Sequence, residues 1–198
     1  MKILKEIYMS YLFKFYSKQY DKFMKKFNLD KNEVIIQRIK DINGLDILDI
    51  GGGTGTLAKE LISLGANVTI LDPEINMTKI AKEKSKEVKV INGYSDNIDL
   101  KDSSIDIIIM RDSFHHINKK EETLKECRRI LNKEGKILIY EFNKKSLIGK
   151  VIFLFETLCF EKISMLNINE MKELTYRYFK TGEIIEISKY EYIYIGIK

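Results

Sequence analysis

A glycine-rich segment at residues 49–55 is the first place where this sequence can bind a ligand. The segment reads DIGGGTG, follows a short apolar run and precedes a helical pattern. Glycine adopts the left-handed backbone that tight turns need, and without a side chain it lets a ligand approach the main chain. The next helix points its first amides at that ligand. A plain strand-to-helix turn is the alternative. The residues expected to contact a cofactor here are Asp49, Gly51, Gly52, Gly53 and Gly55.

A carboxylate ends the second apolar run at Asp72, 17 residues after Gly55. A carboxylate at this place can accept hydrogen bonds from both hydroxyls of a ribose, and it is expected roughly 20 residues after the glycine turn of a nucleoside-binding unit. Asp-Pro is also an ordinary turn at the end of a strand. Beside the glycine segment, Asp72 and Pro73 predict a nucleoside subsite.

Together these residues resemble the class I S-adenosylmethionine-dependent methyltransferases, whose turn reads Asp-x-Gly-x-Gly-x-Gly. A dinucleotide dehydrogenase would show Gly-x-Gly-x-x-Gly, and position 56 is Thr. Residues 104–109, 111–117 and 131–139 extend the resemblance to the group of ubiquinone/menaquinone-biosynthesis methyltransferases and many small-molecule enzymes. The resemblance implies S-adenosyl-L-methionine as cofactor and S-adenosyl-L-homocysteine as product. It implies that Asp49 and the glycines hold the methionine side and that Asp72 holds the ribose.

The position expected near the adenine departs from this family. The family often has Gly-Asp-Ala after its third strand, whereas this chain has Gly93-Tyr94-Ser95-Asp96. Tyr94 cannot accept the bond that a carboxylate would accept. Either Asp96 substitutes, or Tyr94 stacks on the purine, or backbone amides near Ser95 suffice. Ser95, Asp96 and Arg111 complete the expected cofactor-binding set.

Two histidines, His115 and His116, follow the fourth apolar run. Ligands bind at this end of the strands in open α/β sheets. Methyl transfer from a sulfonium is an in-line displacement that needs alignment, with a base only when the acceptor carries a proton. His115, His116 and Asp112 are therefore the candidate catalytic residues, and Asp112 would orient an imidazole or contact the cofactor's amino group. Helix capping and packing are the alternative use of the histidines.

Two flanking segments are expected to build the acceptor side. Tyr16 and Tyr20 end an N-terminal helical pattern, and in the resembled family such a tyrosine often borders the cofactor. Residues 147–160 follow helical spacing but are apolar all round, so they are buried, line a ligand, or meet a membrane or a partner, including a second copy in a homodimer. The predicted acceptor-side residues are Tyr16, Tyr20, Phe114, Glu141 and Phe155. We expect a small, partly hydrophobic acceptor.

The elements that would position these residues alternate between strand and helix patterns, which implies a mostly parallel sheet. Strands are expected at 45–50, 67–71, 88–91, 105–110, 136–142, 183–188 and 191–197, with helices at 54–64, 74–84, 119–132 and from 167 to about 178. Capping boxes at Asp30 with Glu33 and at Asn167 with Glu170 open two helices, and Gly182 is expected to end the second.

The expected fold is therefore α/β: a Rossmann-like, class I methyltransferase fold with a seven-stranded, mostly parallel sheet, an antiparallel last strand and helices on both faces. It forms a single domain over 1–198. Its parts are an N-terminal helical cap (1–41), a cofactor-binding core (45–142), a lid-like insertion (143–166), and a C-terminal helix with two strands (167–198).

The amino-acid composition limits the classes of binding partner that we expect. The chain is 44% hydrophobic and 32% charged, as a globular protein is, and its net charge of +5 is spread along the sequence. No DNA is expected, RNA is disfavoured, and an RNA methyltransferase or a non-catalytic cofactor-binding regulatory or assembly protein are the alternatives. Cys127 and Cys159 are far apart, so no metal and a reducing, cytoplasmic setting are expected. Lysines interrupt the N-terminal apolar residues, so no signal peptide or membrane span is expected.

Overall fold

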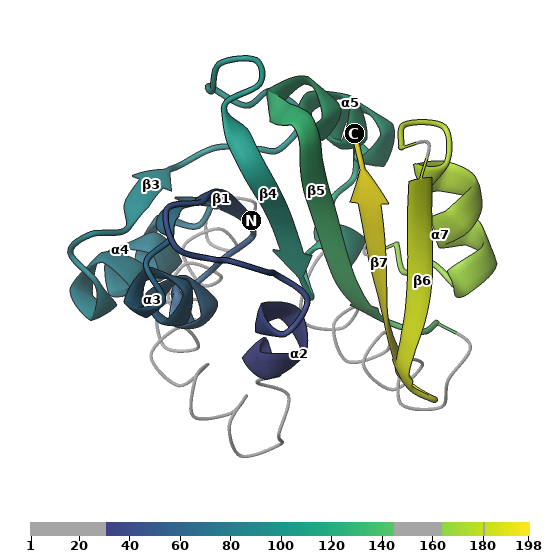
Figure 1. Ribbon diagram of the computed structural model, residues 1–198, viewed down its shortest axis with the longest axis horizontal. Helices are drawn as coiled ribbons and strands as arrows, with labels where there is room; N and C mark the ends of the chain where they lie inside the picture. Colours follow the sequence, from purple (N-terminus) through teal and green to yellow (C-terminus); the bar gives the residue numbers. More distant parts are fainter. Residues whose placement is uncertain (1–30, 145–163, 180) are drawn as a thin grey trace, which may run out of the picture.

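The computed structural model describes residues 31–144, 164–179 and 181–198. Seven strands form one sheet in the order β3-β2-β1-β4-β5-β7-β6 (Figure 1). β7 runs antiparallel to both its neighbours, and the other pairings are parallel. The predicted sheet is thereby confirmed. The strands are β1 (Asp46–Ile50), β2 (Asn67–Leu71), β3 (Lys89–Ile91), β4 (Ile105–Arg111), β5 (Leu131–Phe142), β6 (Thr181–Ser188) and β7 (Glu191–Ile197).

Helices cover both faces of the sheet because successive strand side chains point to opposite sides. Ile47 belongs to the apolar core that contains Leu61, whereas its neighbour Leu48 belongs to the core that contains Leu124. One core is shared with α2, α3 and α4, the other with α5 and α7. These elements are α2 (Asn32–Ile36), α3 (Thr56–Ser63), α4 (Ile75–Lys84), the short 3₁₀ helix η1 (Phe114–His116), α5 (Lys120–Ile130) and α7 (Ile168–Thr175). None of the helices in the described ranges is long and apolar enough to cross a membrane.

Local signals at element ends were partly right. The capping box of Asn167 and Glu170 on α7 is confirmed. Helix α2 has Lys31 at its N-cap position, and the Lys31 side chain pairs with Glu191 at 2.6 Å. Asp30 itself lies outside the described residues.

Several element ends differ from the sequence-based expectation. α7 ends at Thr175, so Gly182 does not end it; Gly182 lies within β6, where a Cβ would stand 2.7 Å from Tyr194. The helix expected up to residue 132 ends at Ile130, and β5 begins at Leu131. Leu131 pairs with Ile105 in the sheet, so residues 131 and 132 belong to β5 although their local sequence pattern continues the helix.

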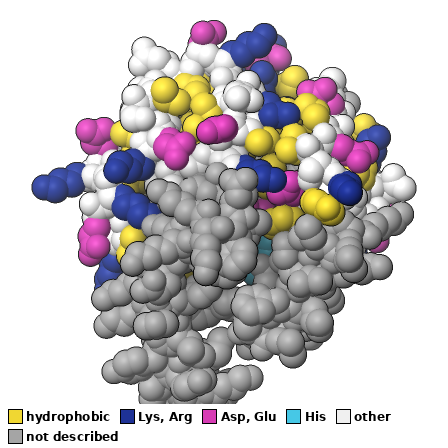
Figure 2. Space-filling model, turned by 90° about the horizontal axis from the view of Figure 1, so that it is seen from below, with side chains coloured by type: hydrophobic (Ala, Val, Ile, Leu, Met, Phe, Trp, Pro, Cys, Tyr) yellow, Lys and Arg dark blue, Asp and Glu magenta, His cyan; other side chains and the backbone are white. Residues whose placement is uncertain are grey.

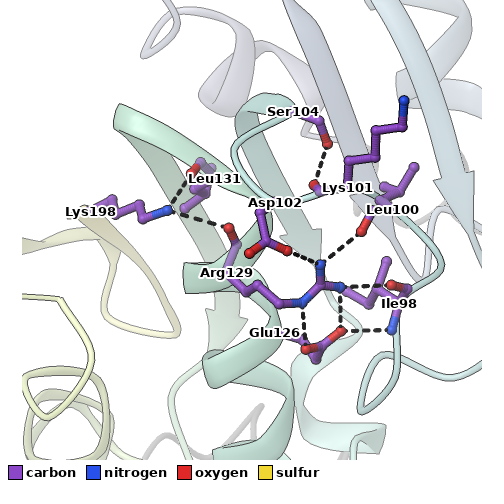
Figure 3. A network of polar contacts seen from close by, with 9 residues as sticks. All are labelled: Ile98, Leu100, Lys101, Asp102, Ser104, Glu126, Arg129, Leu131 and Lys198. Atoms are coloured by element: carbon purple, nitrogen blue, oxygen red, sulfur yellow. Dashed lines mark hydrogen bonds and ion pairs between the residues drawn. The ribbon is translucent and has the colours of Figure 1, made fainter.

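Helix α5 also fixes the connection between β3 and β4 (Figure 3). The Arg129 guanidinium donates to the carbonyls of Ile98 and Leu100, each at 2.8 Å, and to Asp102 Oδ1 at 2.7 Å. Glu126 accepts two further bonds from Arg129 and one from the Ile98 amide. The same guanidinium thus donates five bonds, two to Glu126 on its own helix and three to the loop that carries Ser95 and Asp96 at its other end.

Replacing Arg129 with alanine is expected to lower the free energy of unfolding by about 1–2 kcal/mol, because two carbonyls and Glu126 lose their donor at a partly exposed site. Urea denaturation would measure this. Lys125→Ala, at an exposed position of the same helix, serves as the control and should change stability little. Equal stability of the Arg129 variant and the control would show that the bonds from Arg129 to the loop do not stabilise the fold.

Candidate functional site

The carboxyl ends of the parallel strands meet at one edge of the sheet, which Figure 2 faces. Acidic and basic side chains intermingle on the coloured part of this view, and a small patch of histidine is visible at the border of the grey atoms (Figure 2). The sequence after β1, β2, β4 and β5 supplies the polar groups of this edge. They include the glycine turn, Asp72, and residues Arg111, Asp112 and His115.

The glycine turn adopts the predicted left-handed backbone, with φ of 72° at Gly51, 54° at Gly53 and 72° at Gly55. Gly51 donates its amide to the Leu71 carbonyl at 2.8 Å, which ties the turn to the end of β2. A Cβ at Gly51 would stand 2.4 Å from Ser113 Cβ. Neighbouring side chains therefore require a glycine at this position.

Gly53 differs from the other glycines of the turn. Of the described residues, a Cβ added at Gly53 would meet only the Gly51 carbonyl oxygen, at 3.9 Å, whereas one at Gly52 would stand 2.7 Å from Asp49 Oδ2 and one at Gly55 2.7 Å from Ala81 Cβ. The described residues therefore leave the space over Gly53 open. A ligand approaching the main chain would find room here.

Asp72 lies against this turn. Its Oδ2 accepts the Gly53 amide at 3.0 Å and its Oδ1 accepts the Glu74 amide at 2.8 Å. The carboxyl is largely buried, and burial raises its pKa while these two amides oppose the rise. A carboxylate oxygen has more than one lone pair, so each oxygen can accept a further hydrogen bond. The turn and the acid one strand away are thus brought together as predicted.

Asp49 and Asp112 form a second acidic pair around Arg111. Asp49 is only 2% exposed, and burial raises its pKa to about 7 although Arg111 lowers it. Burial likewise raises the pKa of Asp112 to about 7, against the opposing charge of Arg111. Within the described ranges neither carboxylate oxygen of Asp112 has a hydrogen-bond partner. Buried polar groups normally have partners, so this carboxyl suits a cationic ligand group.

Arg111 is held by groups that the sequence did not identify. Its guanidinium donates to Asn32 Oδ1, and Asn32 Nδ2 donates to Glu60 Oε1 at 2.7 Å. These two hydrogen bonds link β4 to α2 and α3 and keep the positive charge of Arg111 beside Asp49 and Asp112. No spacing in the sequence connects residues 32, 60 and 111, so pattern reasoning had no signal for it.

His115 pairs with Glu141 at the end of β5. The distance from His115 Nδ1 to Glu141 Oε2 is 2.7 Å, and Glu141 Oε1 accepts the amide of His115 at 3.2 Å. His116 is exposed, and its ring lies 4.2 Å from that of His115 between centroids. Both residues were candidates from the sequence, but their direct contact was not anticipated.

The segment after β3 is attached to α5. Ser95 Oγ lies 2.8 Å from Thr123 Oγ1, and Asp96 accepts from Lys119 at 2.7 Å. The Lys119 ammonium holds the pKa of Asp96 below its ordinary value. Tyr94 is 72% exposed. None of the three ways to contact an adenine is singled out by these positions, so Ser95 and Asp96 stay predictions.

Several predicted residues are placed elsewhere or not described. Phe114 is buried in the core shared with α5 and α7, and its acceptor contact stays a prediction. Tyr16, Tyr20, Phe155 and the segment 147–160 lie outside the described residues, as does Cys159. A surface hollow of about 470 Å³ is lined by Asp99, Leu100, Lys101 and Ser104. It lies by the start of β4, away from the strand ends that carry the candidate residues.

The raised pKa of Asp49 predicts a specific dependence of stability on pH. Burial raises that pKa from 3.8 to about 7, so between these values the folded protein holds a proton that the unfolded chain has released. This carboxyl therefore destabilises the fold increasingly as pH rises through that window, and no further above it. Asp49→Asn should raise the free energy of unfolding at pH 8 and leave it nearly unchanged at pH 4.

Urea denaturation of both proteins at these pH values measures the effect. Asp99→Asn, at an exposed position, is the control and should follow the unmodified protein at both pH values. An Asp49→Asn protein that is less stable than the unmodified one at pH 8 would show that Asp49 is not an isolated buried charge.

Comparison with known proteins agrees with this geometry. A methyltransferase domain family matches residues 48–139. A demethylmenaquinone methyltransferase from Thermotoga maritima is 30% identical over 122 residues, which cover 59% of this chain and 53% of that protein. A ubiquinone/menaquinone biosynthesis C-methyltransferase from Hahella chejuensis is 28% identical over 133 residues, covering 61% and 49%. The chain thus spans about half the length of these curated relatives.

Solved structures share the whole fold at low sequence identity. An S-adenosylmethionine-dependent methyltransferase from Thermotoga maritima, described as a possible histamine N-methyltransferase, superposes with a TM-score of 0.78 at 19% identity over 95% of this chain and 99% of that one. Phosphoethanolamine N-methyltransferase 2 from Haemonchus contortus gives 0.72 at 18% identity over 85% and 52%. A methyltransferase domain model thus matches residues 48–139, and the glycine turn, the sheet order and these relatives make the chain similar to the class I S-adenosylmethionine-dependent methyltransferases, including their ubiquinone/menaquinone group.

Proposed function

We propose that this chain transfers the methyl group of S-adenosyl-L-methionine to a small, partly hydrophobic acceptor and releases S-adenosyl-L-homocysteine. One observation carries the proposal: the carboxylate of Asp72 accepts the amide of Gly53 at 3.0 Å, in a turn that the described residues leave open above Gly53. A ribose acceptor and an amide-lined turn are thereby adjacent. These are the two features that a nucleoside with an amino-acid arm requires.

The charges of the site also fit this cofactor. The sulfonium and ammonium groups of S-adenosylmethionine are cationic, and the edge holds Asp49 and Asp112 beside the Arg111 guanidinium, with Asp72 close enough to Asp49 for their charges to interact. Asp112, whose oxygens lack partners in the described part of the chain, suits the ammonium, and Arg111 suits the carboxylate of the amino-acid arm. When bound, the cofactor supplies an electrophilic methyl group.

The proposed residue roles follow from this placement. Asp49, Gly51, Gly52, Gly53 and Gly55 hold the amino-acid arm. Asp72 and Pro73 hold the ribose. The segment of Ser95 and Asp96 borders the adenine, and Arg111 completes the cofactor set.

On the acceptor side, His115, His116 and Asp112 form the proposed catalytic group. Tyr16, Tyr20, Phe114, Glu141 and Phe155 are the proposed surroundings of the acceptor. The curated relatives are named for demethylmenaquinone methylation and for ubiquinone/menaquinone biosynthesis. These names support a small and partly hydrophobic acceptor over a nucleic acid.

The setting of the enzyme is part of the same proposal. We expect it to act in the cytoplasm on a small molecule, without DNA or RNA, and a homodimer is compatible with it. The spread of its net charge of +5 along the sequence supports a small-molecule acceptor over a nucleic acid, because nucleic-acid grooves concentrate basic residues. Cys127 is a buried free thiol, which is the ordinary state in a reducing compartment.

Methyl-labelled S-adenosylmethionine tests this function. The protein would be incubated with reduced 2-methyl-1,4-naphthoquinone, with a set of phenols and amines, or with total RNA, and label would be counted in the organic and RNA fractions. Label in a small molecule, lost in Asp72→Ala, is the expected result. Label confined to RNA would overturn the proposal in favour of RNA methylation. Cofactor binding without any transfer would favour a regulatory protein.

A further inference from the structure

We propose that Glu141 is the positioning residue of His115: it holds the imidazole with its proton on Nδ1, so that Nε2 accepts a proton from the acceptor. This inference rests on the proposed function, because a base is needed only when the methyl acceptor carries a proton. It deepens that function by defining the acceptor class.

Both carboxylate oxygens of Glu141 are in hydrogen-bond contact with His115. Oε2 lies 2.7 Å from Nδ1, and Oε1 accepts the backbone amide of the same histidine at 3.2 Å. The side chain of His115 is 2% exposed and that of Glu141 4%. The histidine carbonyl also accepts the Ser164 amide at 2.8 Å. Ring and backbone are therefore fixed together, and the ring orientation is set by the fold before an acceptor binds.

An ionised carboxylate accepts hydrogen bonds only, so the contact with Glu141 requires a proton on Nδ1. The neutral ring then has its lone pair on Nε2. When Nε2 takes up a proton, the resulting imidazolium forms an ion pair with Glu141 in a poorly solvated place, where opposite charges interact strongly. The pair is thus built to receive a proton.

Among the described residues, four other titratable groups lie near this pair, one of them the His116 ring at 4.2 Å from that of His115. Asp112 follows β4 and interacts electrostatically with both members. Lys120 on α5 lies near Glu141, and burial lowers the pKa of its ammonium to about 8. Tyr192 on β7 is a neutral phenol near Glu141 whose pKa burial raises. Asp112 interacts with the pair through its charge, whereas Glu141 is in hydrogen-bond contact with the ring. Glu141 is therefore the carboxylate that can set the ring's tautomer.

The chemical class of the acceptor follows from the proton that it must give to His115 Nε2. It carries an acidic hydroxyl or amine, such as a phenol, a quinol or a primary amine. As the acceptor's lone pair or conjugated ring carbon forms its bond to the methyl group, the S–CH₃ bond breaks with its electrons remaining on sulfur, and the acceptor's proton passes to Nε2. The positive charge that leaves sulfur ends on the imidazolium beside Glu141, so charge and atoms balance.

Long-range ¹H–¹⁵N NMR of the ligand-free protein reads the tautomer directly. The chain has two histidines, and His116→Asn assigns the signals of His115. We expect the proton on Nδ1 in the unmodified protein, a mixture with the Nε2–H tautomer in Glu141→Gln, and recovery of the Nδ1–H form in Glu141→Asp. Glu191→Gln, another buried carboxylate at this edge, is the matched control and should leave the tautomer unchanged.

A merely structural Glu141 would not control the tautomer. An Nε2–H ring in the unmodified protein, or the same tautomer in Glu141→Gln, overturns the inference. In the transfer assay, Glu141→Gln should lower kcat by about 10-fold and change KM by less than about threefold; an unchanged kcat also overturns it. Calorimetric binding of S-adenosylhomocysteine separates the two proposals. If the unmodified protein does not bind it, the proposed function fails, whatever the tautomer shows.

Discussion

Gly53→Ala is expected to lower the affinity for S-adenosylhomocysteine by about 10–100-fold, because the added methyl group would occupy the open space over the turn and force overpacking worth about 1–3 kcal/mol. Among the residues that the structure describes, only the Gly51 carbonyl oxygen, at 3.9 Å, would lie within 4 Å of the added methyl group. Calorimetry measures the affinity, and urea denaturation measures the stability of the same protein.

Gly44→Ala is the matched control for this substitution. Gly44 also has a left-handed backbone, with φ of 81°, and a Cβ there would meet none of the described residues within 4 Å. Both variants should therefore lose a similar amount of stability, about 1–2 kcal/mol, from the left-handed conformation alone. Only Gly53→Ala should lose affinity. Full affinity in Gly53→Ala would show that the ligand does not approach the main chain there.

Asp72→Ala is expected to weaken binding of S-adenosylhomocysteine by about 10–100-fold, because a hydrogen bond to a charged carboxylate contributes about 1.5–3 kcal/mol. Asp72 also accepts the amides of Gly53 and Glu74, so the variant will lose stability as well. Affinity must therefore be measured well below its unfolding temperature.

A ligand variant separates the ribose role of Asp72 from its structural role. The 3′-deoxy analogue of S-adenosylhomocysteine lacks one hydroxyl that the carboxylate would accept from. The unmodified protein should bind this analogue more weakly than the natural product, whereas Asp72→Ala should bind both equally. This is a double-mutant cycle with one arm on the ligand. Equal discrimination by both proteins would remove Asp72 from the ribose subsite.

Much of the fold was predictable because strong local patterns agree with the sheet. β2 (Asn67–Leu71) and β7 (Glu191–Ile197) begin and end where the sequence indicated. Near-continuous apolar runs such as β4 identify strands covered on both faces. The start of β5 was not predictable, because Leu131 continues a helical pattern and becomes strand only through its pairing with Ile105.

The candidate site was predictable only in its local parts. The glycine turn and Asp72 lie on consecutive strand–turn–helix units, and their spacing carries the signal. The pairing of His115 with Glu141 joins different strand ends, and the bond of Arg111 to Asn32 joins residues 79 positions apart. Such contacts depend on how elements pack, which a single sequence does not encode by spacing.

Titration of the unmodified protein with S-adenosylhomocysteine in a calorimeter tests the central claim most directly. If the open turn at Gly53 and the carboxylate of Asp72 form a nucleoside site, the protein should bind about one molecule per chain with a Kd on the order of 10 μM. Absence of binding heat up to about 1 mM ligand, confirmed by an unchanged unfolding temperature, would contradict it.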